Sequence, residues 1–114
     1  MRTKFLWGVR YADGREVCNL LTKAGRDEYE HRKRQMWDRQ KRRCCLENSD
    51  ADCPGPLRWA DAVFEHQDGR GMDAAHRDDR IEKDGKPYNG VAHAWCNSRK
   101  GSQRVDYTGF YEAP

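Results

Sequence analysis

Two short segments carry the side chains best suited to chemistry. Glu65 and His66 stand side by side at the end of an apolar run in VFEHQDGRGM, and Asn97 follows Cys96 in NGVAHAWCNSRKG. A histidine side chain titrates near neutral pH and can take a proton from water. A carboxylate and an amide oxygen are ligands that a hard cation such as Mg²⁺ prefers. We therefore expect His66 to act as a general base, and Glu65 and Asn97 to bind one divalent cation.

The chain must bend at this pair for both side chains to serve one site, because neighbouring residues of a regular strand point to opposite faces. The segment HQDGRG, with its two glycines, supplies such a break. Alternatives stay open: His66 could be a half-buried histidine bonded to a backbone carbonyl, and Asn97 a helix cap or a surface residue. Asp68 or His76 could replace Glu65 as the ligand. The roles of His76, Asp78 and Asp79 are open.

The cysteines and one further histidine suggest a second metal site. His93 and Cys96 are spaced to share one face of a helix, and zinc prefers thiolate and imidazole ligands in close pairs. The other pair would be Cys45, or its neighbour Cys44, together with Cys53. The alternative is that these cysteines are small core residues and that His93 merely packs. We interpret Cys18 as a core thiol.

The order of elements follows from turn and cap residues. Asp13-Gly14 and Asp84-Gly85 suit tight hairpin turns, Thr22 suits a helix N-cap, and Gly101 suits a helix end. We predict an N-terminal hairpin (1–21), a long helix (22–43), a loop (44–58), a strand (59–66), a polar loop (67–79), a small hairpin (80–88), a short helix (90–100) and a tail with room for one strand (102–114).

The long helix is the basic part of the chain. Between Thr22 and Arg43 there are nine Lys or Arg and four Asp or Glu, a net charge of +5, whereas the whole chain carries +3. Such a block favours a polyanionic partner, most simply nucleic acid, and we name Arg34, Arg39 and Arg42 as phosphate contacts. The alternative is a solvated helix face.

Taken together, these elements resemble the HNH, or ββα-metal, nuclease superfamily, in a variant with Asn in the last position. The matching elements are Glu65-His66, Asn89, His93-x-x-Cys96, Asn97 and Lys100, and the resemblance covers roughly Arg32 to Lys100. It implies an α+β domain over 1–114 with a ββα-metal core at 44–101. It also implies a DNA endonuclease that hydrolyses phosphodiester bonds with Mg²⁺ or Mn²⁺.

The resemblance assigns further roles within this core. Asn89 would orient His66 by bonding backbone across the site. The side chains of Arg77, Arg80, Arg99 and Lys100 are candidates to hold phosphates. Small nucleases of this family occur as phage, mobile-element and restriction proteins, so we expect the cytoplasm of a bacterial or phage-infected cell.

Composition narrows the class of protein. The 114 residues are 36% hydrophobic and 36% charged, which predicts a thin core that a metal would help to hold. There is no signal-peptide core and no apolar run of membrane-spanning length. Two other functions fit the same residues: a zinc-stabilised nucleic-acid-binding module without catalysis, and a protein-interaction module anchored by Trp7, Trp37 and Trp59. Target sequence, the choice between DNA and RNA, and oligomeric state are left open.

Overall fold

The N-terminal residues form a three-stranded antiparallel sheet, where a hairpin was predicted. In the computed structural model, which describes residues 1–69, 76–107 and 110, its strands lie in the order β1 (Arg2–Phe5), β2 (Gly8–Tyr11) and β3 (Glu16–Cys18). The turn at Asp13-Gly14 joins β2 to β3, and Gly14 has the expected positive φ of 94°. The prediction missed the earlier turn between β1 and β2, which has no such glycine pair.

The long helix α1 (Lys23–Arg39) begins as predicted and ends four residues early. The Thr22 hydroxyl accepts a hydrogen bond from the Gly25 N–H at 3.0 Å, which caps the first turn. A Cβ on Gly25 would lie 1.8 Å from the Asn19 carbonyl oxygen, so this glycine permits close packing. The helix stops because Lys41 and Arg42 adopt left-handed backbone angles, with φ of 55° and 59°.

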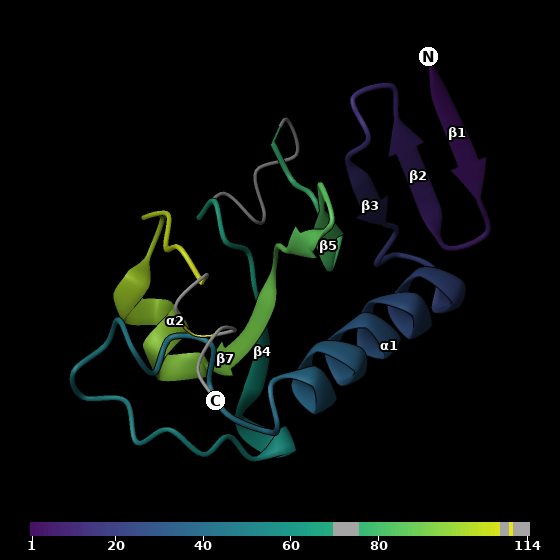
Figure 1. Ribbon diagram of the computed structural model, residues 1–114. Coiled ribbons are helices and arrows are strands. Elements are labelled where there is room, and N and C mark those ends of the chain that lie inside the picture. The colour runs from purple at the N-terminus through teal and green to yellow at the C-terminus, as the bar shows by residue number, and fades with distance from the viewer. Residues whose placement is uncertain (70–75, 108–109, 111–114) are drawn as a thin grey trace.

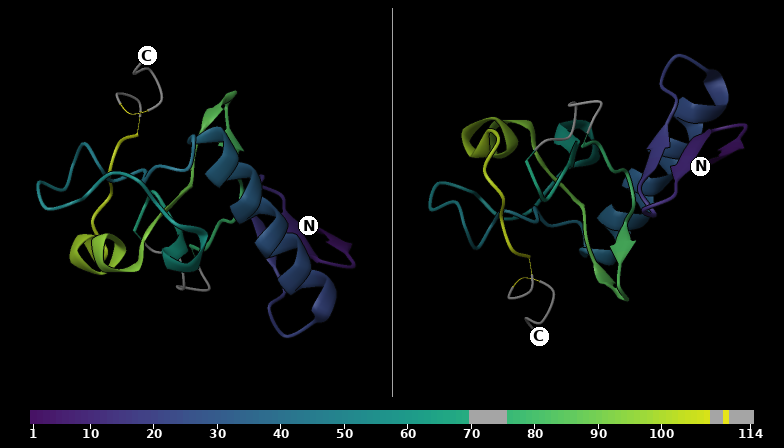
Figure 2. Two further views of the ribbon diagram at one scale, coloured as in Figure 1. Left: turned by 90° about the horizontal axis from the view of Figure 1, so that it is seen from below. Right: turned by 90° about the horizontal axis from the view of Figure 1, so that it is seen from above.

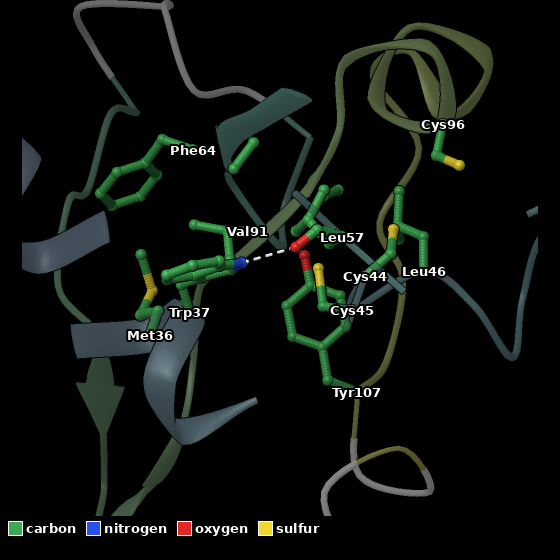
Figure 3. Close-up of a cluster of buried hydrophobic side chains, with 12 residues drawn as sticks. Met36, Trp37, Cys44, Cys45, Leu46, Leu57, Phe64, Val91, Cys96 and Tyr107 are labelled. Carbon is green, nitrogen blue, oxygen red and sulfur yellow. Dashed lines mark hydrogen bonds between the residues drawn. The ribbon is translucent and has the colours of Figure 1, made fainter. Parts of the chain in front are cut away.

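Helix α1 lies between the N-terminal sheet and the rest of the molecule (Figures 1 and 2), in contact with β3 on one side and β7 on the other. Met36 and Trp37 are buried in the core, where the Trp37 indole N–H donates to the Leu57 carbonyl at 2.8 Å (Figure 3). Arg32 is also buried, paired with Glu16 at 2.9 Å and Glu28 at 2.8 Å. The basic helix is therefore not simply a solvated rod.

The second half forms an antiparallel strand pair that leads directly into a helix. Strand β4 (Ala62–Glu65) follows a 3-10 turn (Trp59–Asp61) and pairs with β7 (Gly90–His93), and α2 (Ala94–Lys100) begins at the next residue. The prediction of helix from residue 90 was wrong, because these four residues are buried in the sheet and only Ala94 starts the helix. The helix ends at Gly101, with φ of 60°, as predicted.

The small hairpin between these strands was predicted correctly. It consists of β5 (Glu82–Lys83) and β6 (Lys86–Pro87), joined by Asp84 and Gly85 with φ of 55° and 75°. Residues 102–107 of the tail form no strand, but Tyr107 is buried in the core. The rest of the predicted tail strand would fall largely outside the described residues.

The chain is thus a small α+β protein with two helices and several small antiparallel sheets among its described residues, as expected of the fold class. The buried cluster extends from Met36, Trp37 and Phe64 on one side to Cys44, Leu46 and Cys96 on the other (Figure 3). None of the described helices is both long and apolar enough to cross a membrane.

Candidate functional site

Glu65, His66 and Asn97 line one surface pocket of about 250 Å³. Glu65 is the last residue of β4, His66 follows it, and Asn97 lies on α2. Because β4 ends at Glu65, the two neighbours escape the alternation of a strand and both reach the pocket, as the sequence required. Lys100, one turn beyond Asn97 on α2, lines the same pocket. The fold therefore collects the predicted oxygen ligands and the predicted base in one place.

Glu65 is fully buried and only half paired. One carboxylate oxygen accepts a hydrogen bond from the Lys100 ammonium, whereas Oε2 has no hydrogen-bond partner among the described residues. Burial raises the pKa of Glu65 to about 7, although the hydrogen bond and charge of Lys100 oppose the shift. A buried, unpaired carboxylate oxygen beside an amide side chain is a donor set that fits a divalent cation.

The His66 ring bonds a carboxylate whose position could not be predicted from the sequence. Its Nε2 lies 2.8 Å from Oδ1 of Asp79, which is completely buried. Burial opposes ionisation of Asp79, but hydrogen bonds from His66, Arg77 and the Cys18 N–H outweigh it, so the pKa of Asp79 lies below its ordinary value. The ionised carboxylate can only accept, so Nε2 carries a proton, and in the neutral form of the ring Nδ1 has the lone pair.

Two further contacts fix the His66 ring and its backbone. The Phe64 ring stacks on the imidazole with centroids 4.5 Å apart, and the Lys100 ammonium donates to the His66 carbonyl at 2.7 Å. His66 is therefore half-buried, and its ring bonds a carboxylate. The alternative considered from the sequence was a ring bonded to a backbone carbonyl.

Asn89 fixes the two segments that flank the pocket. Its Oδ1 accepts from the Gln67 N–H at 3.0 Å, and its Nδ2 donates to the carbonyls of Asp78 at 2.8 Å and Arg80 at 2.7 Å. These hydrogen bonds fix Gln67, which follows His66, relative to the segment around Asp79. Asn89 thus bonds backbone across the site without touching the His66 ring.

The other acidic candidates lie elsewhere. Asp68 accepts a hydrogen bond from the Tyr88 hydroxyl and pairs with Arg104 at 3.0 Å. Together with His76 and Asp78 it lines a different pocket, of about 520 Å³, that contains neither Glu65 nor Asn97. This arrangement gives Asp68 and His76 no share in the Glu65 pocket.

A cluster that could hold the second predicted metal ion is present, with Cys44 in the place of Cys45. Ligand atoms of Cys44, Cys53, His93 and Cys96 all lie within 4.8 Å of one another. Cys45 is not part of this cluster: its sulfur lies beside Gly90 of β7, where an added Cβ would come within 2.8 Å of it. Cys44 and Cys45 stand at the start of a turn, in which the Glu47 N–H donates to the Cys44 carbonyl at 3.1 Å, and only Cys44 belongs to the cluster.

The spacing of the four side chains suits a tetrahedral ion. Nδ1 of His93 lies 3.6 Å from the Cys53 sulfur and 3.7 Å from the Cys96 sulfur. A nitrogen at about 2.1 Å and a sulfur at about 2.3 Å from a tetrahedral zinc ion are about 3.6 Å apart. The His93 Nε2 donates to the Pro56 carbonyl at 2.8 Å, which leaves the Nδ1 lone pair for the ion.

Backbone hydrogen bonds close the loop that carries Cys53. The Cys44 N–H donates to the Gly55 carbonyl at 2.9 Å, and the Leu57 N–H donates to the Arg42 carbonyl at 2.8 Å. The Cys45 N–H in turn donates to the Val91 carbonyl at 3.0 Å, which attaches this segment to β7. The loop therefore returns to its own start, and both cysteines meet the residues that follow β7.

Burial and a neighbouring arginine affect the ionisation of the cysteine thiols. In the metal-free protein burial raises the pKa of Cys44 to about 11, so an ion must displace the thiol proton to bind. The Arg99 guanidinium lies 3.5 Å from the Cys96 sulfur and would stabilise its thiolate. Cys18 lies apart from the cluster as a buried thiol, as predicted.

Most of the predicted phosphate contacts already have partners. Five of the seven named cations bond acidic side chains at 3.2 Å or less: Arg39 with Glu82, Arg77 with Asp79, Arg80 with Asp78, Arg99 with Asp50, and Lys100 with Glu65. Arg34 has no carboxylate within ion-pair distance among the described residues, and Arg42 has only Asp38 at 3.8 Å. The structure thus singles out Arg34 and Arg42.

Of the residues that build the site, Asp79 could not be given a role from the sequence, and Gln40 was missed. Asp79 sits in a charged loop without periodicity, so no pattern could link it to His66. Gln40 is buried, accepts from the Val91 N–H at 2.9 Å and donates to the Val91 carbonyl at 2.9 Å, and so satisfies the backbone of β7. Its place two residues before the chain turns at Arg42 gives no signal in the sequence.

Comparisons of this chain with models of protein families, with curated proteins and with solved structures found no match. A function must therefore be inferred from the geometry of the two clusters and from the sequence motif.

Proposed function

We propose that this protein is a metal-dependent endonuclease that hydrolyses phosphodiester bonds in DNA. The observation that carries the proposal is the pocket shared by Glu65, His66 and Asn97, with Asp79 behind the histidine. The order of an antiparallel strand pair and a following helix also agrees with what the HNH resemblance implies. The absence of matches to known proteins leaves this assignment to direct experiment.

His66 is the general base. With its Nε2 proton bonded to Asp79, its Nδ1 can accept a proton from a water molecule in the pocket. Asp79 positions the ring and stabilises the imidazolium that forms, in the manner of a carboxylate behind a catalytic histidine. Asn89 bonds the backbone beside His66 and beside Asp79, and so fixes the two segments relative to each other.

Glu65 and Asn97 are the ligands for Mg²⁺ or Mn²⁺. The unpaired Oε2 of Glu65 is available for the cation, and Asn97 offers an amide oxygen from α2 in the same pocket. When bound, the ion supplies positive charge for the scissile phosphate and its leaving oxygen. Lys100 pairs with the other oxygen of Glu65 and lines the same pocket.

The Cys44, Cys53, His93 and Cys96 cluster serves stability in this proposal. A zinc ion there would join the loop at residues 44–57 to the end of β7 and the start of α2, and thereby fix the helix that carries Asn97. The four protein ligands leave no open coordination position for catalysis.

A zinc-stabilised nucleic-acid-binding module without catalysis is the second candidate, because the cysteine and histidine cluster and the unpaired Arg34 require no active site. It gives no reason for the buried, unpaired oxygen of Glu65. The protein-interaction alternative has less support, since Trp37 is buried, and Trp7 and Trp59 are half-buried beneath the guanidiniums of Arg32 and Arg34.

Cleavage of supercoiled plasmid separates these candidates. Wild-type protein should cut with Mg²⁺ or Mn²⁺, and His66→Ala should cut about 10²–10⁴ times more slowly, the usual contribution of a general base. His76→Ala is the matched control, because His76 lines the other pocket. DNA binding without cleavage by zinc-loaded wild-type protein would support the second candidate instead.

A further inference from the structure

Two arginines stack on two tryptophans beside the end of α1. The Arg34 guanidinium lies 4.1 Å from the Trp59 ring centroid and 5.3 Å from that of Trp37, and the Arg42 guanidinium lies 4.7 Å from that of Trp37. The two indoles are 5.3 Å apart and inclined at 55°. We call Arg34, Trp37, Arg42 and Trp59 the cation–tryptophan stack.

The stack has a rigid foundation. Trp37 is 7% exposed and donates its indole N–H to the Leu57 carbonyl, so its ring is fixed in the core (Figure 3). Trp59 is half buried in the turn that enters β4. The left-handed backbone at Lys41 and Arg42 turns the chain back on the helix and brings the Arg42 guanidinium over Trp37. Left-handed residues other than glycine are uncommon, and two in succession mark a conformation that the surroundings impose.

The guanidiniums of the stack keep their hydrogen-bond donors. A cation on an indole uses its flat face, so the N–H groups in its plane stay available. Neighbouring arginines differ: Arg43 bonds Glu47 at 2.8 Å, and Arg58 bonds Asp61 at 2.9 Å. Arg34 is exposed and without a carboxylate partner among the described residues, and Arg42 and Asp38 are both exposed at 3.8 Å. Fixed forks of free N–H donors match the oxygens of a phosphodiester.

Helix α1 connects the stack to the proposed active site. Tyr29 of α1 lines the catalytic pocket and stacks on Phe64 at 4.6 Å, and Trp37 lies eight residues farther along the same helix. Eight residues of α-helix span about 12 Å. Phosphates of one strand of duplex DNA are spaced about 3.4 Å along its axis, so on a duplex parallel to α1 this length spans three or four phosphates.

We propose that the cation–tryptophan stack clamps the phosphate backbone of duplex DNA on one side of the cleaved bond. We expect the clamp to have no sequence preference, because its donors are directed at phosphates. It requires none of the paired cations of α1. The choice of DNA as the partner rests on the proposed nuclease function, but the clamp itself does not require cleavage.

Binding should be measured on zinc-loaded His66→Ala protein without added divalent cations, so that catalysis plays no part. The probe is a fluorescent duplex of random sequence, followed by anisotropy from 50 to 300 mM salt. Arg34→Gln with Arg42→Gln removes the clamp, and Arg43→Gln with Arg58→Gln is the matched control, since it removes the same charge from paired neighbours. Trp59→Leu keeps every charge and removes one indole face.

The clamp predicts a specific ranking. The double variant of the stack should bind on the order of 50-fold more weakly at 0.1 M salt, and its salt slope should flatten by about 2, since each lost phosphate contact removes about 0.9 from the slope. The control pair should change affinity by less than about threefold. Trp59→Leu should lower affinity about threefold with the slope unchanged, because only the support of the cation is lost.

Some outcomes would overturn the clamp, and others would separate it from the nuclease proposal. Equal losses in the stack and control pairs would show that only net charge matters. A wild-type protein that does not bind the duplex at 50 mM salt would exclude a DNA backbone as the partner. Plasmid cleavage with no special effect of the stack variants would leave the nuclease proposal standing without the clamp, and stack-dependent binding without cleavage would leave the clamp standing without the nuclease.

Discussion

The two adjacent cysteines offer the sharpest test of the metal cluster. Cys44 and Cys45 are both buried, with exposed fractions of 0% and 2%, and they differ mainly in the direction of the thiol. Only Cys44 belongs to the group with Cys53, His93 and Cys96. Cys44→Ser should therefore lose the zinc ion, and Cys45→Ser should keep it.

The magnitudes of the two effects differ widely. Structural zinc contributes about 10–16 kcal/mol to the folding of zinc-finger peptides, which matches or exceeds the whole stability of a small domain, about 5–15 kcal/mol. Cys44→Ser leaves three ligands and should abolish cooperative folding at 37 °C. Cys45→Ser places a hydroxyl in the core at Gly90 and should cost about 1–3 kcal/mol, the price of an unpaired buried polar group.

The assay is elemental analysis of purified protein that has never met a chelator, together with thermal denaturation followed by circular dichroism. Wild type and Cys45→Ser should carry about one zinc per chain, in keeping with a single four-ligand site. Cys44→Ser should carry almost none. Equal zinc content in the two variants, or loss from Cys45→Ser alone, would refute the ligand set.

Three further predictions follow from the same contacts. Asn97→Ala should raise the Mg²⁺ or Mn²⁺ concentration needed for half-maximal cleavage at least tenfold, with activity partly restored at high metal; an unchanged metal requirement would remove Asn97 from the site. Because hydrogen bonds hold the pKa of Asp79 below its ordinary value, its ionised form stabilises the fold above that value and the contribution is lost as pH falls through the lowered pKa. The gap in unfolding free energy between wild type and Asp79→Asn, from urea titrations, should thus be widest near neutral pH and shrink below about pH 4; a constant gap would contradict the pairing with His66. Burial raises the pKa of Cys18 to about 12, so iodoacetamide at pH 8 should label Cys18 of the folded, zinc-loaded protein far more slowly than Cys18 of the urea-unfolded chain, followed by mass spectrometry, and equal rates would show that the N-terminal sheet does not protect this thiol.

Local signals in the sequence predicted local structure well. Asp13-Gly14, Asp84-Gly85, Thr22 and Gly101 each stand where their backbone preferences require, because a turn or cap depends on a few neighbouring residues. The strand at residues 90–93 was predicted as helix, because its short apolar run has no period that separates the two. Its assignment depends on pairing with β4 and on contact with α1, which lie far away in the chain.

The candidate site was predictable in its residue types and not in its connections. The residues that the motif groups, Glu65, His66 and Asn97, line one pocket, because α2 follows β7 directly and packs back against β4. The partner of His66 and the choice of Cys44 depend on the path of two loops, which no periodicity encodes. Charge counting could not show which cations already have partners, and five of the seven named as phosphate contacts bond carboxylates, such as Arg39 with Glu82.

The most direct test of the central claim is the rate of plasmid cleavage by zinc-loaded wild type and by His66→Ala, purified identically and assayed with Mn²⁺. We expect wild type to convert supercoiled plasmid to nicked and linear forms. The variant should keep its zinc and its melting temperature and cut about 10²–10⁴ times more slowly. Wild-type protein that binds its zinc and leaves the plasmid intact, or a folded His66→Ala protein that cuts at the wild-type rate, would contradict it.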